Sequence, residues 1–239
     1  MILAIAVATC VSTVLGGVFA LHLRDRLHLI LGFSAGAVVA VAFFDLIPEA
    51  IELGEGFYDP SFLLSVTALG FLIYLVLDRL LLMHSHAGEE PGLHQHRGIT
   101  GAGTLSLHSF LDGMGIGLAF QVSTAVGIVV AVAVLAHDFA DGINTVNFIT
   151  KNNGSRRLAA RWLAVDAAAP VLGIIATLFF TLPAAHLAVL LSLFAGFFLY
   201  IGASDLIPES HHAHPAFLTT AMTILGAGVL YVVIKIAGV

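Results

Sequence analysis

Long apolar runs separated by short polar turns dominate the sequence. A helix needs roughly 20 apolar residues to cross a hydrocarbon core of about 30 Å. Eight runs of about this length fill most of the chain, so residues 1–239 are predicted to form one polytopic transmembrane domain. The first run is long and uninterrupted, and we interpret it as a retained helix rather than a cleaved signal peptide. The pattern predicts an all-α integral membrane protein with eight transmembrane helices, over Ile2–Leu21, Leu29–Leu46, Ser61–Leu82, Ile99–Phe120, Ser123–Ile149, Leu158–Thr181, His186–Leu206 and Ala216–Ile236.

The basic residues fall on one side of the predicted membrane. All of the Lys and Arg residues except Lys235 follow or flank the loops after predicted helices 1, 3 and 5, whereas the loop after helix 2 is acidic. Basic loops stay in the cytoplasm, so both termini are expected outside it, in an inner or plasma membrane. The basic residues on the cytoplasmic side are Arg24, Arg26, Arg79, Arg97, Lys151, Arg156, Arg157 and Arg161.

Two segments of the chain match at a constant offset of 160 residues. Ala35-Gly36 followed by Asp45–Glu49 (DLIPE) recurs as Ala195-Gly196 followed by Asp205–Glu209. The predicted topology sends helix 2 outward and helix 7 inward, so helices 1–3 and 6–8 form an inverted repeat around helices 4 and 5. Such repeats are typical of secondary transporters. The alternative is that DLIPE merely ends a helix twice, with Pro stopping it.

Composition narrows the class of protein further. Hydrophobic residues make up 59% of the chain and charged residues only 10%, which excludes a soluble enzyme and a disordered protein. Nine Lys and Arg against fifteen Asp and Glu leave no basic face for nucleic acid. The single cysteine, Cys10, excludes a disulfide framework and a thiolate metal cage.

Predicted helices 4 and 5 carry polar residues that do not belong in lipid. Both contain the pattern H-x-F-x-D-G, at His108–Gly113 and at His137–Gly142. A carboxylate in the middle of a span costs several kcal/mol unless it is paired, metallated or hydrated. In each helix the His and the Asp that precedes the Gly of the motif are four residues apart and share a face.

The spacing of the two motifs predicts that they meet. A turn near Val122 makes helices 4 and 5 an antiparallel hairpin, in which His108 and His137 lie about 21 and 22 Å from the turn at about 1.5 Å per residue. Two imidazoles and two or three carboxylates at one depth suit a divalent transition metal, and imidazole favours zinc, iron, nickel or copper. Glycines allow close backbone approach here. They are Gly113, Gly115, Gly117 and Gly142.

Other polar residues are secondary candidates. Asp138 is expected to serve a second metal or to support the first, and Asp166 on helix 6 is deep enough to join. The region 84–98 is expected to be a His-rich cytoplasmic loop, which either gathers metal weakly or is simply solvated. The same two readings apply to the histidines after helix 7. The residues in these two segments are His84, His86, Glu89, Glu90, His94, His96, His211, His212 and His214.

Taken together, these features resemble the ZIP (Zrt/Irt-like) metal transporters over essentially the whole chain. The shared features are an inverted 3+2+3 arrangement, a His-rich loop after helix 3 and paired motifs on helices 4 and 5. Gly32–Gly36 and Leu46–Ala50 on helix 2 are similar to the prokaryotic branch. The resemblance implies a ZIP-like fold and import of zinc or a related divalent ion to the cytoplasm, with iron, manganese and cadmium as further substrates. It also implies dimerisation, and movement of helices 1, 4, 5 and 6 against helices 2, 3, 7 and 8.

The chain departs from the family's usual H-N-x-P-E-G motif. Asp replaces Glu in both copies, and Leu111 and Ala140 replace the prolines. Ser109 stands where the family has Asn and is a poorer ligand, which weakens the expectation of a second, bridged metal. By motif, the candidate metal ligands are His108, Asp112, His137, Asp138 and Asp141, with Ser109 and Asp166 as further candidates.

The sequence therefore predicts a divalent-metal permease that works by alternating access, with no enzyme activity and no cofactor besides the transported ion. Its partners are the metal substrate and the lipid bilayer. Because neutral histidine is required, uptake should weaken as pH falls toward about 6. The alternatives are an intramembrane zinc hydrolase, which lacks an H-E-x-x-H motif here, a proton-translocating membrane protein, and a metal exporter.

Overall fold

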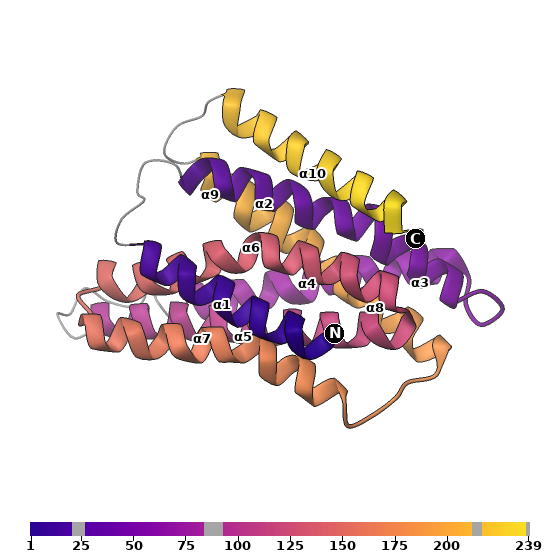
Figure 1. Cartoon of the computed structure of the whole chain (residues 1–239), viewed down its shortest axis with the longest axis horizontal. Helices are drawn as coiled ribbons and strands as arrows, with labels where there is room; N and C mark the ends of the chain where they lie inside the picture. Colours follow the sequence, from indigo (N-terminus) through magenta and orange to yellow (C-terminus); the bar gives the residue numbers. More distant parts are fainter. Residues whose placement is uncertain (21–26, 84–92, 212–216, 238–239) are drawn as a thin grey trace.

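The computed structural model describes residues 1–20, 27–83, 93–211 and 217–237, and within these ranges it contains helices and no strand (Figure 1). Residues 84–92, which hold most of the predicted His-rich loop, lie outside the described ranges, as do His212 and His214. The end of that region, from residue 93, is already helical. The helices are α1 Ile2–Phe19, α2 Leu27–Val41, α3 Ile47–Leu53, α4 Pro60–Met83, α5 Leu93–Val122, α6 Thr124–Lys151, α7 Arg156–Thr177, α8 Ala184–Tyr200, α9 Ile207–His211 and α10 Phe217–Ala237.

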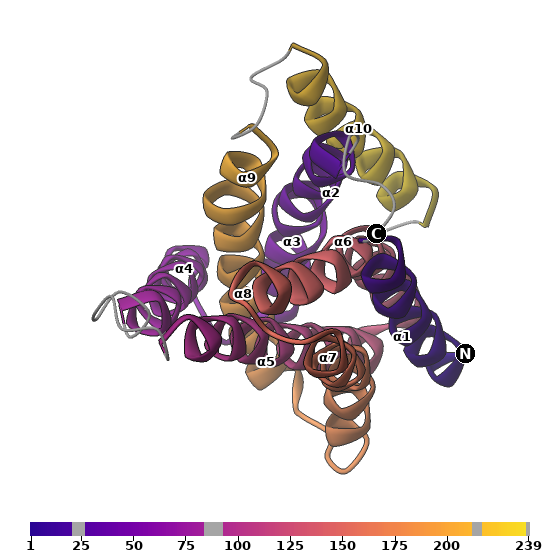
Figure 2. The ribbon, with the colours of Figure 1, turned by 90° about the vertical axis from the view of Figure 1, so that its left-hand side faces the viewer.

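The predicted all-helical membrane fold is confirmed. Seven helices of the described chain are long and apolar enough to cross a membrane. The remaining predicted span, Ile99–Phe120, corresponds to α5, which has 30 residues and packs against α6, α7 and α8. It is less apolar than the others because its middle carries His108, Ser109 and Asp112. The most buried spans are those of α2, α6 and α8, whereas α1, α4 and α10 lie at the periphery (Figure 2).

The second and seventh spans continue past the DLIPE motifs, where the sequence placed their ends. Each passes through a short π-helical segment, η1 over Ala42–Leu46 and η2 over Ile201–Leu206, and then resumes as α3 or α9. Pro48 lies in the first turn of α3, directly after the π-helical segment, so the helix continues through the proline. The expectation that proline stops these helices is therefore wrong. The α7 helix instead ends at Thr177, four residues earlier than expected.

The helix contacts follow the inverted repeat. The C-terminal α3 of the second span packs against α8, and α9 packs against α2, so these two spans run antiparallel. Exchanging the halves also maps the α2–α10 contact onto α4–α8, and the α1–α6 contact onto α5–α7. The two π-helical segments end at Leu46 and Leu206, the same offset of 160 residues as the DLIPE motifs.

Four helix pairs are locked together by glycines on both sides. A Cβ atom on any of these glycines would lie 1.8–2.3 Å from a backbone carbonyl oxygen of the partner helix, closer than real Cβ atoms approach. Small residues of this kind allow backbones to touch in membrane helices. Gly113 and Gly142 thus bring α7 and α1 close, rather than α5 and α6. The pairs are Gly16/Gly142 (α1–α6), Gly113/Gly173 (α5–α7), Gly36/Gly226 (α2–α10) and Gly70/Gly196 (α4–α8).

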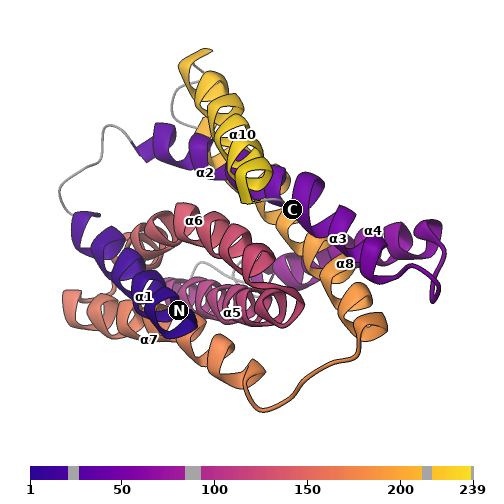
Figure 3. The same ribbon diagram turned by 45° about the vertical axis from the view of Figure 1, so that its right-hand side comes forward.

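These contacts divide the bundle into two groups of helices. One, the α5/α6 group, comprises α1, α5, α6 and α7; the other, the α4/α8 group, comprises α2–α3, α4, α8–α9 and α10 (Figure 3). Between the groups, the apolar core is formed by side chains such as those of Ile116, Val130, Leu191 and Phe198. No glycine-to-backbone lock of the kind above joins the two groups in the described residues.

Candidate metal site

The hairpin of α5 and α6 brings the two H-x-F-x-D-G motifs to one level. The α5 helix ends at Val122, and Ser123 caps α6 by accepting a hydrogen bond from the Val126 N–H at 3.1 Å. This is the predicted turn, and it places the rings of His108 and His137 with their centroids 5.6 Å apart. The expectation that these two histidines meet is therefore confirmed.

Four side chains from the two helices form a compact group. The ligand atoms of His108, Asp112, His137 and Asp141 all lie within 4.8 Å of one another, and all four residues are buried. Asp112 Oδ2 lies 3.0 Å from Nε2 of His108 and 3.1 Å from Nε2 of His137. Asp141 Oδ2 lies 3.6 and 3.8 Å from the same two nitrogens.

Four of the six spacings among these ligand atoms are close to those of a tetrahedral zinc site. Zinc binds imidazole nitrogen and carboxylate oxygen at about 2.0–2.2 Å, so ligand atoms at the corners of the tetrahedron lie about 3.4 Å apart. The four nitrogen–oxygen distances, from 3.0 to 3.8 Å, bracket that value. Among the described residues, Asp141 Oδ2 is buried and has no hydrogen-bond partner, which is expected for a metal-binding oxygen.

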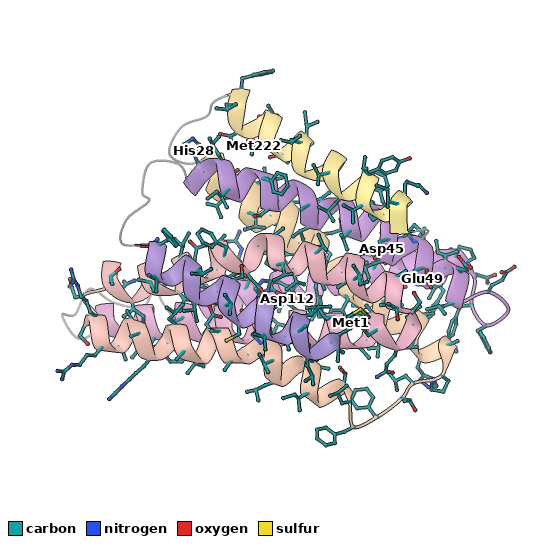
Figure 4. The ribbon with its side chains drawn as sticks, viewed as in Figure 1. Met1, His28, Asp45, Glu49, Asp112 and Met222 are labelled. Carbon is teal, nitrogen blue, oxygen red and sulfur yellow. The ribbon has the colours of Figure 1, made fainter. Side chains whose placement is uncertain are left out.

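The group lies deep in the protein, and Asp112 is near the middle of the bundle (Figure 4). Two carboxylates in such a place need positive charge, because an uncompensated buried charge costs several kcal/mol. The donor set combines nitrogen and oxygen atoms, which suits borderline transition metals better than magnesium or calcium. The arrangement can therefore hold a dehydrated divalent transition-metal ion.

His137 is oriented by its own helix. Its Nδ1 lies 3.0 Å from the carbonyl oxygen of Ala133, and because a carbonyl only accepts, Nδ1 carries a proton. This directs Nε2 toward the carboxylates, the arrangement that metal-binding histidines use. The 3.1 Å contact between Nε2 and Asp112 also requires a shared proton, which an arriving cation must displace.

His108 is oriented by a different helix. Its Nδ1 lies 2.8 Å from the hydroxyl oxygen of Tyr74 on α4, so its Nε2 also faces the carboxylates. Sequence reasoning missed Tyr74, because it lies in the apolar run of the third span. The available signal was its hydroxyl group, since a buried tyrosine usually finds a hydrogen-bond partner.

The remaining candidate ligands lie beside the group of four rather than in it. Asp166 is fully buried and accepts hydrogen bonds from Ser109 and Thr145, each at 2.8 Å. Ser109 thus donates to a carboxylate of α7, and Thr145 is a second partner that the sequence did not reveal. Asp138 is buried, and both of its carboxylate oxygens lack a hydrogen-bond partner among the described residues.

Comparison with known proteins identifies relatives for this helical bundle. The family model described as ZIP Zinc transporter matches residues 97–234, which cover α5 to α10 except for the first residues of α5 and the last of α10. Zinc transporter ZIP9 of Micropogonias undulatus is 30% identical over 164 residues, which are 62% of this chain and 52% of that protein. Zinc transporter ZIP6 of Homo sapiens is 27% identical over 138 residues, 53% of this chain and 18% of that protein.

A third relative, Protein zntB of Dictyostelium discoideum, is 30% identical over 92 residues, 36% of this chain and 24% of that protein. The chain thus spans about half the length of ZIP9 and about a fifth of ZIP6. Assignment to the prokaryotic branch stays a prediction. Since the family match covers more than half of the sequence and includes both histidine motifs, this multi-pass membrane protein belongs to the ZIP zinc transporter family.

Proposed function

We propose that this protein transports a divalent transition-metal ion across a membrane, with zinc as the first substrate. The observation that carries the proposal is the buried group of His108, Asp112, His137 and Asp141, whose spacings fit a tetrahedral ion. The relatives named as zinc transporters support the choice of zinc. Membership of the ZIP zinc transporter family also argues against the alternative of an intramembrane zinc hydrolase.

The four side chains act on the ion by replacing its water. Two imidazole lone pairs and two carboxylate oxygens supply ligands and negative charge where the surrounding core is apolar. A dication bound to two carboxylates leaves a site with no net charge, which lowers the free energy of holding it in low dielectric. Asp138 and Asp166 lie close enough to support the site or to take a second ion. Iron, manganese and cadmium remain candidate substrates.

Transport proceeds by alternating access in this proposal. The α5/α6 group carries the ligands. Glycine contacts lock α1 to α6 and α5 to α7, and the α5–α6 and α1–α7 contacts join these two pairs, so the group can move as one body. The interface with the α4/α8 group is formed mainly by apolar side chains, which can slide past one another, and it also includes the Tyr74–His108 and Ser34–Ala136 hydrogen bonds. Movement of one group against the other exposes the ion first to one side and then to the other.

We infer import into the cytoplasm from the family resemblance, and the basic loops give the orientation of the chain in the membrane. The connection between α6 and α7, which is rich in Lys and Arg, lies at the end of the bundle opposite the N-terminus of α1 and the C-terminus of α10 (Figure 1). The positive-inside rule then puts both termini outside, in an inner or plasma membrane. A homodimer within the lipid bilayer is the assembly that the family resemblance implies.

A sealed-vesicle assay tests the proposal. Purified protein is reconstituted around an encapsulated zinc-sensitive dye, and wild type is compared with His137→Ala and Asp141→Ala. His186→Ala is the matched control, because His186 begins α8 far from the site. Zinc-dependent signal from wild type and the control, lost in both site variants, supports the proposal; equal signals from all four proteins refute it.

The same vesicles separate metal transport from the proton-translocating alternative. With a pH-sensitive dye and no added metal, a proton carrier moves protons and the proposed transporter does not. Competition by iron, manganese, cadmium and cobalt then gives the substrate range. External zinc applied to vesicles of known protein orientation gives the direction, and efflux alone would overturn the inference of import.

A further inference from the structure

The two ligand histidines are held in place in different ways. His137 donates from Nδ1 to Ala133 O, four residues earlier in the same helix, so its orientation depends only on α6. His108 has Nδ1 against the hydroxyl of Tyr74, which belongs to α4 in the α4/α8 group. One imidazole is therefore oriented from within the group that carries the site, and the other from the group opposite.

Tyr74 is itself firmly placed within the α4/α8 group. Its ring packs against Tyr200 and Phe197 of α8, with centroids 5.2 and 5.6 Å away. Tyr200 donates a hydrogen bond at 2.8 Å to Asp78, one turn after Tyr74 on α4. The ring of His108 meets Tyr74 edge to face, with centroids 6.0 Å apart. A continuous set of contacts thus fixes the hydroxyl against which His108 rests.

We infer that Tyr74 is a positioning residue for the metal site, which ties the orientation of His108 to the position of the α4/α8 group. Tyr74 does not touch the ion, because its hydroxyl meets Nδ1 while Nε2 faces the carboxylates. Partners of this kind orient a histidine ligand and set its donor strength. This inference rests on the proposed transport function.

The consequence is that metal affinity differs between conformations. While the groups hold the relation seen here, Tyr74 keeps His108 aimed at the ion and all four ligands are in place. When the α5/α6 group moves, His108 leaves the Tyr74 hydroxyl and becomes free to rotate, whereas His137 keeps its backbone partner. The site then loses one well-oriented ligand, which lowers its affinity and favours release.

A second hydrogen bond between the groups provides a control. Ser34 of α2 donates to the carbonyl oxygen of Ala136 in α6, beside His137 but without contact to a ligand side chain. Its removal loosens the two groups from each other and leaves His108 on Tyr74. Ser34→Ala therefore separates an effect on ligand orientation from an effect on group contact.

The test measures zinc affinity of the purified full chain in detergent, by competition with a chromophoric chelator, and the visible absorption spectrum of bound Co²⁺. Tyr74→Phe keeps the ring and removes the hydroxyl. We expect its zinc affinity to fall roughly 10- to 100-fold, the usual effect of losing an outer partner of a ligand. The cobalt spectrum changes as well, because one nitrogen donor is no longer fixed. Tyr231→Phe on α10, and Ser34→Ala, retain the wild-type affinity and spectrum.

Tyr200→Phe is a second variant, which loosens Tyr74 without removing its hydroxyl and gives a smaller change in the same direction. Wild-type affinity and spectrum in both tyrosine variants overturn the inference. An equal loss in Ser34→Ala and Tyr74→Phe also overturns it, since group contact alone would then explain the effect. If wild type and His108→Ala bind zinc equally, the proposed site itself fails, an outcome distinct from failure at Tyr74 alone.

Discussion

Alanine in place of Gly142 tests whether the metal ligands depend on the backbone contact between α1 and α6. The new Cβ would lie 1.9 Å from the carbonyl oxygen of Thr13, whereas real Cβ atoms stay beyond 3.0 Å. The two helices must therefore separate by roughly 1.1 Å at this crossing, a shift well beyond the tolerance of about 0.2 Å for metal–ligand distances. Asp141 is the adjacent residue and moves with the backbone.

We expect Gly142→Ala to weaken zinc binding at least roughly tenfold and to lower stability by about 1–3 kcal/mol through overpacking. Two glycines of α10 provide matched controls. Gly226→Ala disturbs a similarly close crossing with α2, where a Cβ would lie 2.0 Å from Phe33 O, and should lower the melting temperature with zinc affinity unchanged. Gly228 has nothing within 4 Å of its Cβ position, so alanine there should be harmless.

Zinc titration and thermal unfolding in detergent measure both effects. If Gly142→Ala binds zinc as wild type does, the ligands do not depend on this crossing. If Gly226→Ala loses zinc affinity as strongly, the loss reflects general destabilisation rather than displacement of Asp141. Either result contradicts the reasoning that the helix crossing sets the site.

Three further outcomes follow from the site. Asp112→Asn removes the carboxylate that faces both imidazoles. The loss of about 3–5 kcal/mol for a broken buried pair predicts at least roughly 100-fold weaker zinc binding, measured by equilibrium dialysis. The control variant Asp59→Asn changes an exposed carboxylate and should bind zinc as wild type does, and equal zinc binding by the two variants contradicts the assignment of Asp112. Zinc binding should release protons, because Nε2 of His137 shares one with Asp112, so affinity should fall as pH is lowered. Calorimetry in buffers of different ionisation enthalpy that detects no proton release would count against this. Thr145→Val leaves the buried Asp166 with one donor fewer and should lower stability by about 1–3 kcal/mol; an unchanged melting temperature would exclude a structural role for that bond.

The features that sequence predicted are those set by local spacing. Helix existence follows from the length of apolar runs, since a bilayer requires about 20 such residues. The meeting of His108 and His137 follows from nearly equal distances to one tight turn, and the residue-by-residue rise of a helix makes such arithmetic reliable. The inverted repeat was visible because DLIPE is rare enough to recognise twice.

The features that sequence did not predict depend on contacts between distant segments. The Tyr74–His108 and Thr145–Asp166 hydrogen bonds join helices whose facing sides cannot be read from periodicity in uniformly apolar spans. Proline suggested an end to the second span, but the π-helical segment before Pro48 lets the helix continue. Gly113 and Gly142 do mark close backbone contacts, as predicted, but these contacts are with α7 and α1 and not between α5 and α6.

The π-helical segment η1 has a genetic consequence. A π-turn holds one residue more than an α-turn, and each residue turns a helix by about 100°. Here Asp45 is buried while the neighbouring Phe43 and Phe44 are about half exposed. Loss of one codon within Ala42–Phe44 would restore ordinary helical pairing, yet it would change which residues of this turn face the core and would move the Asp45 carboxylate out of its buried position. An in-frame deletion that a surface loop would tolerate is thus expected to abolish membrane insertion or assembly, measurable as loss of folded protein, and alignments of relatives should show no gap at this place.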